Sequence, residues 1–223
     1  GLRAMKHLSG PGFREVTGVS RETFDKLSLY VDLLIKWQDH TNLVSRGSLK
    51  DVWSRHVFDS IQIHPHLLDK NVITLDFGSG AGFPGLVLAI MGVPNVVLIE
   101  SNKKKCSFLK EVVRQTHCEA EVFVGRVQEY RPSALAKYIT SRALASLESL
   151  LLMSYPLLGQ GGSCLFLKGE SYEQELTQAK KRWNMDVQTH SSNAKDLETS
   201  DAIQKLSSYG VLLEIRNLSP RDK

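Results

Sequence analysis

An apolar run ends in a glycine-rich turn at Leu75–Gly82, and this feature restricts the fold more than any other in the 223-residue chain. The run Val72–Leu75 suits a buried strand, and Pro84–Ile90 suits a helix that begins with proline, where the missing N–H costs nothing. Strand, glycine turn and helix form the unit by which a parallel α/β sheet presents backbone N–H groups to a ligand. The turn needs glycine because it must adopt positive φ and let a ligand approach the backbone.

Strands and helices alternate regularly from Val72 onward, which predicts a parallel sheet with helices on both faces. The strands are expected at Val72–Phe77, Val96–Glu100, Glu121–Val124, Lys137–Ser141, Ser163–Lys168, Met185–Thr189 and Val211–Ile215. The helices are expected at Pro84–Met91, Lys103–Thr116, Leu144–Leu158 and Glu170–Trp183. Gly161-Gly162 should turn the chain into the fifth strand, and a polar connection, 191–201, precedes the last one. The final hairpin-like pair makes the last strand antiparallel, so we predict a doubly wound, seven-stranded α/β sheet.

Two predicted helices precede this sheet and form an N-terminal helical prefix, residues 1–70. Apolar positions recur at helical spacing after Ser20, a residue type that suits an N-cap. The second helix is expected to start at Ser48, where Asp51 completes an S-x-x-D cap, and to end near His64 because a proline follows.

Composition is that of an ordinary globular protein, with 42% hydrophobic and 23% charged residues. We expect one compact unit in which residues 71–223 form the ligand-binding domain. No apolar run approaches the roughly 18–20 residues that span a bilayer, so we expect a cytoplasmic protein without membrane contact, and a monomer is favoured. The three cysteines lack metal-ligand spacing, which predicts reduced thiols and no metal site. The net charge of +4 permits an anionic partner.

Two cofactors compete for the glycine turn. The glycines within Gly80–Gly85 satisfy G-x-G-x-x-G, and Glu100 lies about 20 residues on, as a dinucleotide site expects. The glycines begin earlier, at Gly78, with Asp76 two residues before. A carboxylate there repels a pyrophosphate but suits the ammonium and sulfonium groups of S-adenosylmethionine. S-adenosylmethionine is therefore favoured, and NAD(P) and an ordinary glycine-rich turn stay open as alternatives.

Residues after the other strands suit the same ligand. Glu100 ends the second strand, where an acid accepts bidentate hydrogen bonds from ribose hydroxyls. The segment Gly125–Tyr130 follows the third strand and would lie over an adenine, whose edge the Gln128 amide suits. Arg142 follows the fourth strand, where a guanidinium would hold a phosphate or orient the cofactor, and Lys168 ends the fifth strand on the same rim.

Absent motifs restrict the reaction. Methylation of an exocyclic amine usually needs an Asn/Asp-Pro-Pro-aromatic motif, which the chain lacks. Methylation of pyrimidine C5 needs a cysteine nucleophile, often directly after a proline, and no cysteine of this chain follows a proline. A ring nitrogen with a free lone pair, such as guanine N7, carries no proton, so its methylation needs positioning but no general base. His56 stands on a predicted helix of the prefix, where a lone histidine is more often part of the core.

Five segments together resemble the RsmG (GidB) family, and the resemblance covers roughly residues 27–169. The glycine motif is generic to methyltransferases, whereas its F-P-G extension, the R-H-x-x-D-S helix and the S-R-A segment are much more specific. The five segments are Trp53–Ser60, Leu75–Gly85, Ile99–Leu109, Gly125–Tyr130 and Ser141–Ala143.

The resemblance implies a Rossmann-like class I methyltransferase that uses S-adenosylmethionine to methylate N7 of the guanine at position 527 of bacterial 16S ribosomal RNA. The substrate would be that RNA, the small ribosomal subunit or an assembly intermediate. Cofactor contacts carried over by motif are Gly78, Phe83, Val127, Gln128 and Arg142, which join Asp76, Gly80 and Glu100 from the reasoning above. The family often has Ala-Glu where this chain has Val127-Gln128, so a carboxylate role does not transfer there.

RNA contacts are expected at a set of basic residues: Arg46, Arg55, His56, Arg126 and Lys168. The resemblance raises the interest of His56 and Asp59 without giving either a role. No general base is required, and Arg142 has an orienting role. A methyltransferase for another RNA or a small molecule, and a non-catalytic RNA-binding protein that retains the cofactor fold, stay open as alternatives.

Overall fold

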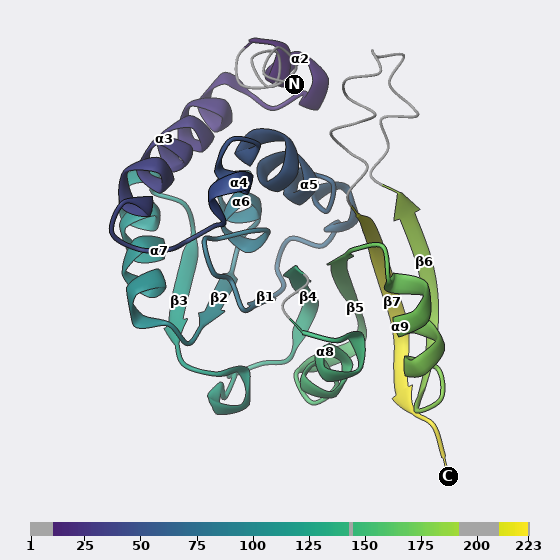
Figure 1. The fold of residues 1–223 in the computed structure, drawn as a ribbon. Coiled ribbons are helices and arrows are strands. Elements are labelled where there is room, and N and C mark those ends of the chain that lie inside the picture. The colour runs from purple at the N-terminus through teal and green to yellow at the C-terminus, as the bar shows by residue number, and fades with distance from the viewer. Residues whose placement is uncertain (1–10, 143–144, 192–209, 223) are drawn as a thin grey trace.

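The structure, a computed structural model, describes residues 11–142, 145–191 and 210–222. Within these ranges, seven strands form one sheet in the order β3-β2-β1-β4-β5-β7-β6 (Figure 1). The strands are β1 (Thr74–Phe77), β2 (Val96–Glu100), β3 (Ala120–Val124), β4 (Ala136–Arg142), β5 (Leu158–Lys168), β6 (Trp183–Ser191) and β7 (Val211–Pro220). Strands β1 to β5 are parallel, and β7 is antiparallel to both β5 and β6. The predicted seven-stranded sheet with an antiparallel last strand is therefore confirmed.

Helices cover both faces of the sheet. They are α2 (Pro11–Thr17), α3 (Arg21–Gln38), α4 (Arg46–Leu49), the π-helix η1 (Val52–Val57), α5 (Phe58–Ile61), α6 (Gly85–Ile90), α7 (Lys103–Thr116), α8 (Leu147–Ser154) and α9 (Tyr172–Ala179), with 3₁₀ turns at η2 (His64–His66) and η3 (Val127–Glu129). In the described ranges, no helix has the length and hydropathy that crossing a membrane requires.

Alternate side chains of each strand enter two separate cores. In β2, Val96 and Leu98 pack with α3, α6 and α7, whereas Val97 and Ile99 pack with α8 and α9. This alternation places the two helical layers on opposite faces, because successive side chains of a strand point to opposite sides. Every residue of β2 is buried, as expected of a central parallel strand.

The N-terminal helices share the first core with the sheet. Leu27 and Leu34 of α3 belong to the same buried cluster as Leu86 of α6 and Phe108 of α7. The rings of Trp37 and Phe108 lie 5.7 Å apart. Figure 1 shows α3 beside α7 and α5 beside α6. The prefix thus packs directly on the sheet, and the division into 1–70 and 71–223 stays a prediction.

The first predicted helix of the prefix is confirmed, but the second is wrong in its start and its continuity. Ser20 caps α3 by accepting a hydrogen bond from the backbone N–H of Thr23. The second helix is broken into α4, η1 and α5. Ser45, not Ser48, is the cap of α4, and Asp51 makes no capping bond because its carboxylate pairs with Arg55 at 3.3 Å.

Several predicted bounds in the second half are also wrong. Helix α8 ends at Ser154, and β5 begins at Leu158, so Gly161-Gly162 lies inside the strand instead of turning into it. Gly161 has φ +73°, and the register with β4 shifts beside it, so the glycines form an irregularity in the ladder. Helix α9 ends at Ala179, four residues before the prediction. Residues 192–201 of the predicted connection lie outside the described residues.

Candidate active site

A cleft of about 440 Å³ separates the turn after β1 from the prefix. We call Gly78–Phe83 the sheet wall and Leu43–His56 the prefix wall, and Lys105 and Arg142 complete the lining. The lining residues are Leu43, Val44, Ser45, Ser48, Arg55, His56, Gly78, Ser79, Gly80, Ala81, Phe83, Lys105 and Arg142. A cavity of about 460 Å³ also lies beside α8 and α9, and none of the predicted site residues lines it.

Left-handed glycines and a buried acid shape the sheet wall. Gly78 has φ +63° and Gly80 has φ +55°, and residues other than glycine rarely adopt this left-handed region of φ. Glu100, at the end of β2, accepts hydrogen bonds from the backbone N–H of Gly80 at 2.8 Å and of Asn102 at 2.7 Å. The Glu100 carboxylate therefore fixes the turn. It also keeps unused lone pairs, because each of its oxygens accepts one bond here.

Asp76 acts from beneath the sheet wall. Its side chain is fully buried and does not line the cleft. One carboxylate oxygen accepts from the Ser79 hydroxyl at 2.6 Å, and the other accepts from the Thr140 hydroxyl at 2.7 Å. Burial raises the pKa of Asp76 to about 6, although these hydrogen bonds oppose the shift. Asp76 thus holds the turn through Ser79, and it has no direct opening toward a ligand in the cleft.

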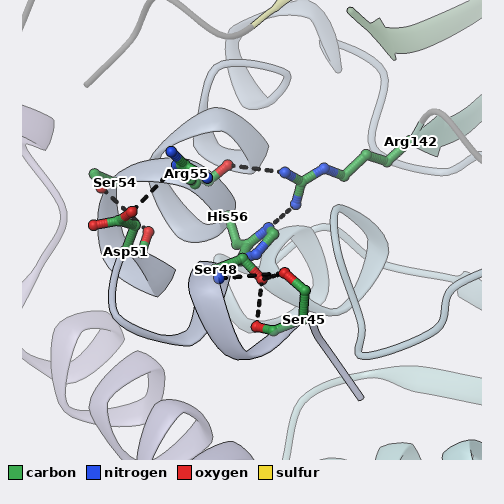
Figure 2. Close-up of polar contacts among 7 residues, drawn as sticks. All are labelled: Ser45, Ser48, Asp51, Ser54, Arg55, His56 and Arg142. Carbon is green, nitrogen blue, oxygen red and sulfur yellow. Dashed lines mark hydrogen bonds and ion pairs between the residues drawn. The ribbon is translucent and has the colours of Figure 1, made fainter. Parts of the chain in front are cut away.

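His56 and Arg142 join the two walls. The His56 ring stacks on Phe83 of the sheet wall, with ring centroids 4.9 Å apart and planes at 21°. Arg142 contacts Nδ1 of His56 and donates to the backbone oxygen of Arg55 at 3.3 Å (Figure 2). Burial, and then the Arg142 charge, lower the pKa of His56 to about 3. The imidazole is therefore neutral near pH 7, and an Nδ1 that accepts from Arg142 places its proton on Nε2.

Short-range polar contacts shape the prefix wall internally, whereas Arg142 fixes its position against the sheet wall. Ser45 donates its hydroxyl to that of Ser48 at 2.9 Å, and Ser54 donates to the backbone oxygen of Asp51 at 3.2 Å (Figure 2). Asp59 lies outside the cleft lining. Burial raises the pKa of Asp59 to about 7, and one of its buried carboxylate oxygens has no hydrogen-bond partner among the described residues.

The remaining predicted residues lie away from the cleft lining. Val127 and Gln128 form η3, where Gln128 is exposed, and Arg126 precedes this turn and is exposed. Arg46 is exposed on α4, next to the cap residue of that helix. Lys168 is buried, and its ammonium lies 3.0 Å from both the Ala145 backbone oxygen and the Glu175 carboxylate. This ammonium faces protein partners, so Lys168 is not open to a phosphate.

The structure thus brings together Gly78, Gly80, Phe83, Arg55, His56 and Arg142. It also adds lining residues that sequence reasoning missed, among them Ser45, Ser48 and Lys105. Ser45 carried a signal, since a serine three residues before Ser48 is as good a cap as Ser48 itself. Tyr30 of α3 donates its hydroxyl to the Ala81 backbone oxygen. No local sequence signal indicated this contact, because the two residues are 51 positions apart.

Known sequences match most of the chain. The family described as rRNA small subunit methyltransferase G (GidB) matches residues 23–203. Ribosomal RNA small subunit methyltransferase G of Paramagnetospirillum magneticum is 50% identical over 169 residues, which cover 76% of this chain and 82% of that protein. The protein of the same name from Rhodospirillum centenum is 43% identical over 209 residues, which cover 94% and 91%.

Solved structures with the same fold include two methyl-transfer or AdoMet-bound proteins. The tRNA (m1A58) methyltransferase TrmI from Aquifex aeolicus aligns with a TM-score of 0.53 at 16% identity, over 74% of this chain and 69% of that one. The structure of M. jannaschii TYW2 in complex with AdoMet aligns with a TM-score of 0.52 at 14% identity, over 73% and 76%. At these identities the likeness shows the fold alone.

Proposed function

This chain belongs to the rRNA small subunit methyltransferase G family, and we propose that it methylates N7 of the guanine at position 527 of 16S ribosomal RNA with S-adenosylmethionine. The RNA would be presented by the small ribosomal subunit or one of its assembly intermediates, in the cytoplasm. The observation that carries the proposal is the cleft, because its sheet wall offers a bare glycine turn and its prefix wall offers basic groups. The monomeric state stays a prediction.

The residues of the sheet wall fit the donor. Gly78 and Gly80 expose backbone to the cleft, and we assign to them the methionine half. Glu100 keeps lone pairs for the ribose hydroxyls, and Val127 and Gln128 on η3 would contact the adenine. When bound, S-adenosylmethionine supplies a methyl group on a sulfonium, which becomes a neutral thioether when the C–S bond breaks.

The chain's own residues position the acceptor instead of moving a proton. Guanine N7 attacks with its lone pair and carries no hydrogen, so the new N–CH₃ bond forms without a base. His56 is unsuited to that role in any case, since its pKa is lowered to about 3 and its Nδ1 faces Arg142. We assign to Arg142 an orienting role, because its planar guanidinium holds the prefix wall in register with the strand ends.

The charged RNA face of the proposal consists of Arg46, Arg55 and Arg126; Lys168 is left out because its ammonium is buried, and His56, predicted as an RNA contact, is left out because it is buried and its lowered pKa leaves it neutral near pH 7. Binding to a polyanion releases counterions, so log K should fall linearly with log[salt]. Arg46→Gln should reduce the magnitude of this slope by about one unit, which is the value of one phosphate contact. Arg182→Gln is the matched control, since this exposed arginine lies between α9 and β6 and pairs with Glu148. Equal slopes for both variants would remove Arg46 from the RNA face.

The reaction itself is tested with labelled donor and small-subunit particles that lack the modification. We expect one methyl group per particle, at N7 of guanine 527, from the wild-type chain and from Gly169→Val. A Cβ at Gly169 meets nothing within 4 Å, whereas Gly78→Val strains a residue at φ +63°. Folded Gly78→Val should therefore lose donor binding and transfer.

Each alternative has its own outcome in this assay. Label on a different RNA or on a small molecule would favour another substrate. Tight RNA binding without label in any fraction, with S-adenosylhomocysteine still bound, would favour a non-catalytic protein that retains the cofactor fold. Unchanged donor affinity in folded Gly78→Val would overturn the assignment of the sheet wall.

A further inference from the structure

Three metal-ligating side chains from distant parts of the chain meet at the β6–β7 side of the sheet. They are His66 of η2, His190 near the end of β6, and Glu214 of β7. One potential ligand atom from each lies within 4.8 Å of the other two, and the histidine rings are 4.4 Å apart. None of the three lines the cleft. This cluster is therefore separate from the proposed methyl-transfer site.

The separations between the ligand atoms are close to those around a small metal ion. Nδ1 of His66 lies 3.4 Å from Oε2 of Glu214, and Nε2 of His190 lies 3.7 Å from Oε1. Zinc bonds of about 2.0–2.1 Å in tetrahedral geometry place ligand atoms about 3.3–3.4 Å apart. A shared ion thus needs only small side-chain adjustments from the arrangement already present.

Burial makes the cluster costly without a ligand. Glu214 is 4% exposed, and its neighbours Leu213 and Ile215 face the second core. A buried carboxylate must be paired to offset its lost hydration. Nε2 of His190 is also buried, and among the described residues it has no hydrogen-bond partner. A cation between the imidazoles and the carboxylate would satisfy both groups at once.

The surroundings are compatible with a cation. Arg216 is the nearby positive charge, with a terminal nitrogen 3.3 Å from Oε2 of Glu214. Its side chain is 57% exposed, so the guanidinium has room to move aside or to remain as an outer partner of the carboxylate.

We propose that His66, His190 and Glu214 bind one Zn²⁺ ion, with water as the fourth ligand. Two imidazole nitrogens and one carboxylate oxygen form a donor set that binds Zn²⁺ in preference to Mg²⁺ or Ca²⁺. The ion ties the end of the prefix, through His66, to the two last strands of the sheet. Sequence analysis predicted no metal site because the three ligands, at positions 66, 190 and 214, show no local spacing.

The test is calorimetric titration of the untagged full-length chain, freed of metal by chelation, with ZnCl₂. We expect one site per chain, and His190→Ala should weaken binding at least tenfold, because even outer partners of a metal ligand contribute about 10–100-fold. His64→Ala is the matched control, since His64 lies in the same 3₁₀ turn but not in the cluster, and it should bind as the wild type does. Zn²⁺ should also raise the melting temperature of the wild type but not of His190→Ala.

Arg216 and cobalt supply independent readouts. Arg216→Gln should tighten Zn²⁺ binding, because it removes a positive charge that competes for Glu214. Bound Co²⁺ should show the intense visible absorption of a four-coordinate site, and Glu214→Gln should abolish it. No binding, or equal binding by the wild type, His190→Ala and Glu214→Gln, would overturn the proposal and leave the cluster as an ion pair network. Methyl transfer is not a readout in any of these experiments, so the result is independent of the proposed function.

Discussion

The two walls of the cleft are held in place over very different distances along the chain. The sheet wall is fixed by Asp76, which bonds Ser79 three residues on, and by Glu100, which bonds the backbone of Gly80 twenty residues away. The prefix wall is fixed by Arg142, whose partner His56 is 86 residues distant. The first wall is built mainly within one strand–turn–helix unit and the strand beside it, with Thr140 and Tyr30 as additional partners from farther along the chain. The second wall is held against the first only once β4 has joined the sheet, because Arg142 ends that strand.

This difference separates the general part of the site from its particular part. A glycine turn held by two acids suits the methyl donor that we propose, S-adenosylmethionine, whatever the acceptor, because the geometry of the turn comes from backbone conformation and short hydrogen bonds. The prefix wall adds the basic groups that we propose contact the RNA. Changes in the sheet wall should therefore affect folding and donor binding, and changes in the prefix wall should affect transfer and pH dependence.

The largest effect is expected at Gly85, the first residue of α6, which follows the sheet wall directly and packs against Asp76 beneath that wall. A Cβ there would lie 2.6 Å from the Asp76 carboxyl group, which is buried and cannot move aside. Gly85→Ala should lower the free energy of unfolding by about 2–3 kcal/mol, as overpacking does. Gly47→Ala in the prefix wall meets nothing within 4 Å and should change it by no more than about 0.5 kcal/mol. Chemical denaturation measures both, and equal effects would contradict the comparison.

A smaller effect is expected at Arg142, where the walls meet. Arg142→Ala removes hydrogen bonds from a charged donor, worth about 1.5–3 kcal/mol, so kcat/KM should fall about 100-fold. Arg142→Lys keeps the charge but loses the planar fork, and a loss of about tenfold is expected. Arg114→Ala on the surface of α7 is the control and should leave transfer unchanged. If Arg142→Lys matched the wild type, charge alone would be sufficient at this position.

The smallest effects are opposite pH dependences of stability at His56 and Asp59. The pKa of His56 falls from 6.5 to about 3 in the folded state, so acidification below pH 6.5 protonates the unfolded chain first and costs stability. The pKa of Asp59 rises from 3.8 to about 7, so its contribution to stability is lost as the pH rises from about 4 to 7.

His56→Gln should therefore lose relative to the wild type as the pH rises from 4 to 6.5, and Asp59→Asn should gain over the same interval. One pKa unit corresponds to about 1.4 kcal/mol, so shifts of this size set an upper bound of about 3 kcal/mol over this interval, and local relaxation with entry of water should reduce each difference to about 1 kcal/mol. Urea unfolding at several pH values measures both curves. Parallel curves for the two variants would show that neither residue has the environment described.

Sequence patterns predict those parts of the fold whose causes are local. The bounds of β2 and α7 match to the residue, because a continuous apolar run and a 3.6-residue period end at clear capping residues. The π turn of η1 has no such period, and Ser45 and Ser48, three residues apart, are equally good candidates for one cap, so the second prefix helix is mispredicted. Lys168 shows the same limit for the site, since the partner that holds its buried ammonium, the half-buried Glu175, is contributed by a different element, α9.

The hydrogen bond from Tyr30 to the Ala81 backbone oxygen links helix α3 to the glycine turn, and any coupling free energy that it carries between these two parts is reciprocal. This buried contact, together with the edge contact between the rings of Tyr30 and Phe83 at 5.3 Å, joins helix α3 to the glycine turn. Where a ligand that orders the turn also favours the docked position of α3, anything that stabilises α3 raises the affinity of the turn for that ligand by the same factor. The free energy of the complete complex is then the same whichever of the two parts is ordered first.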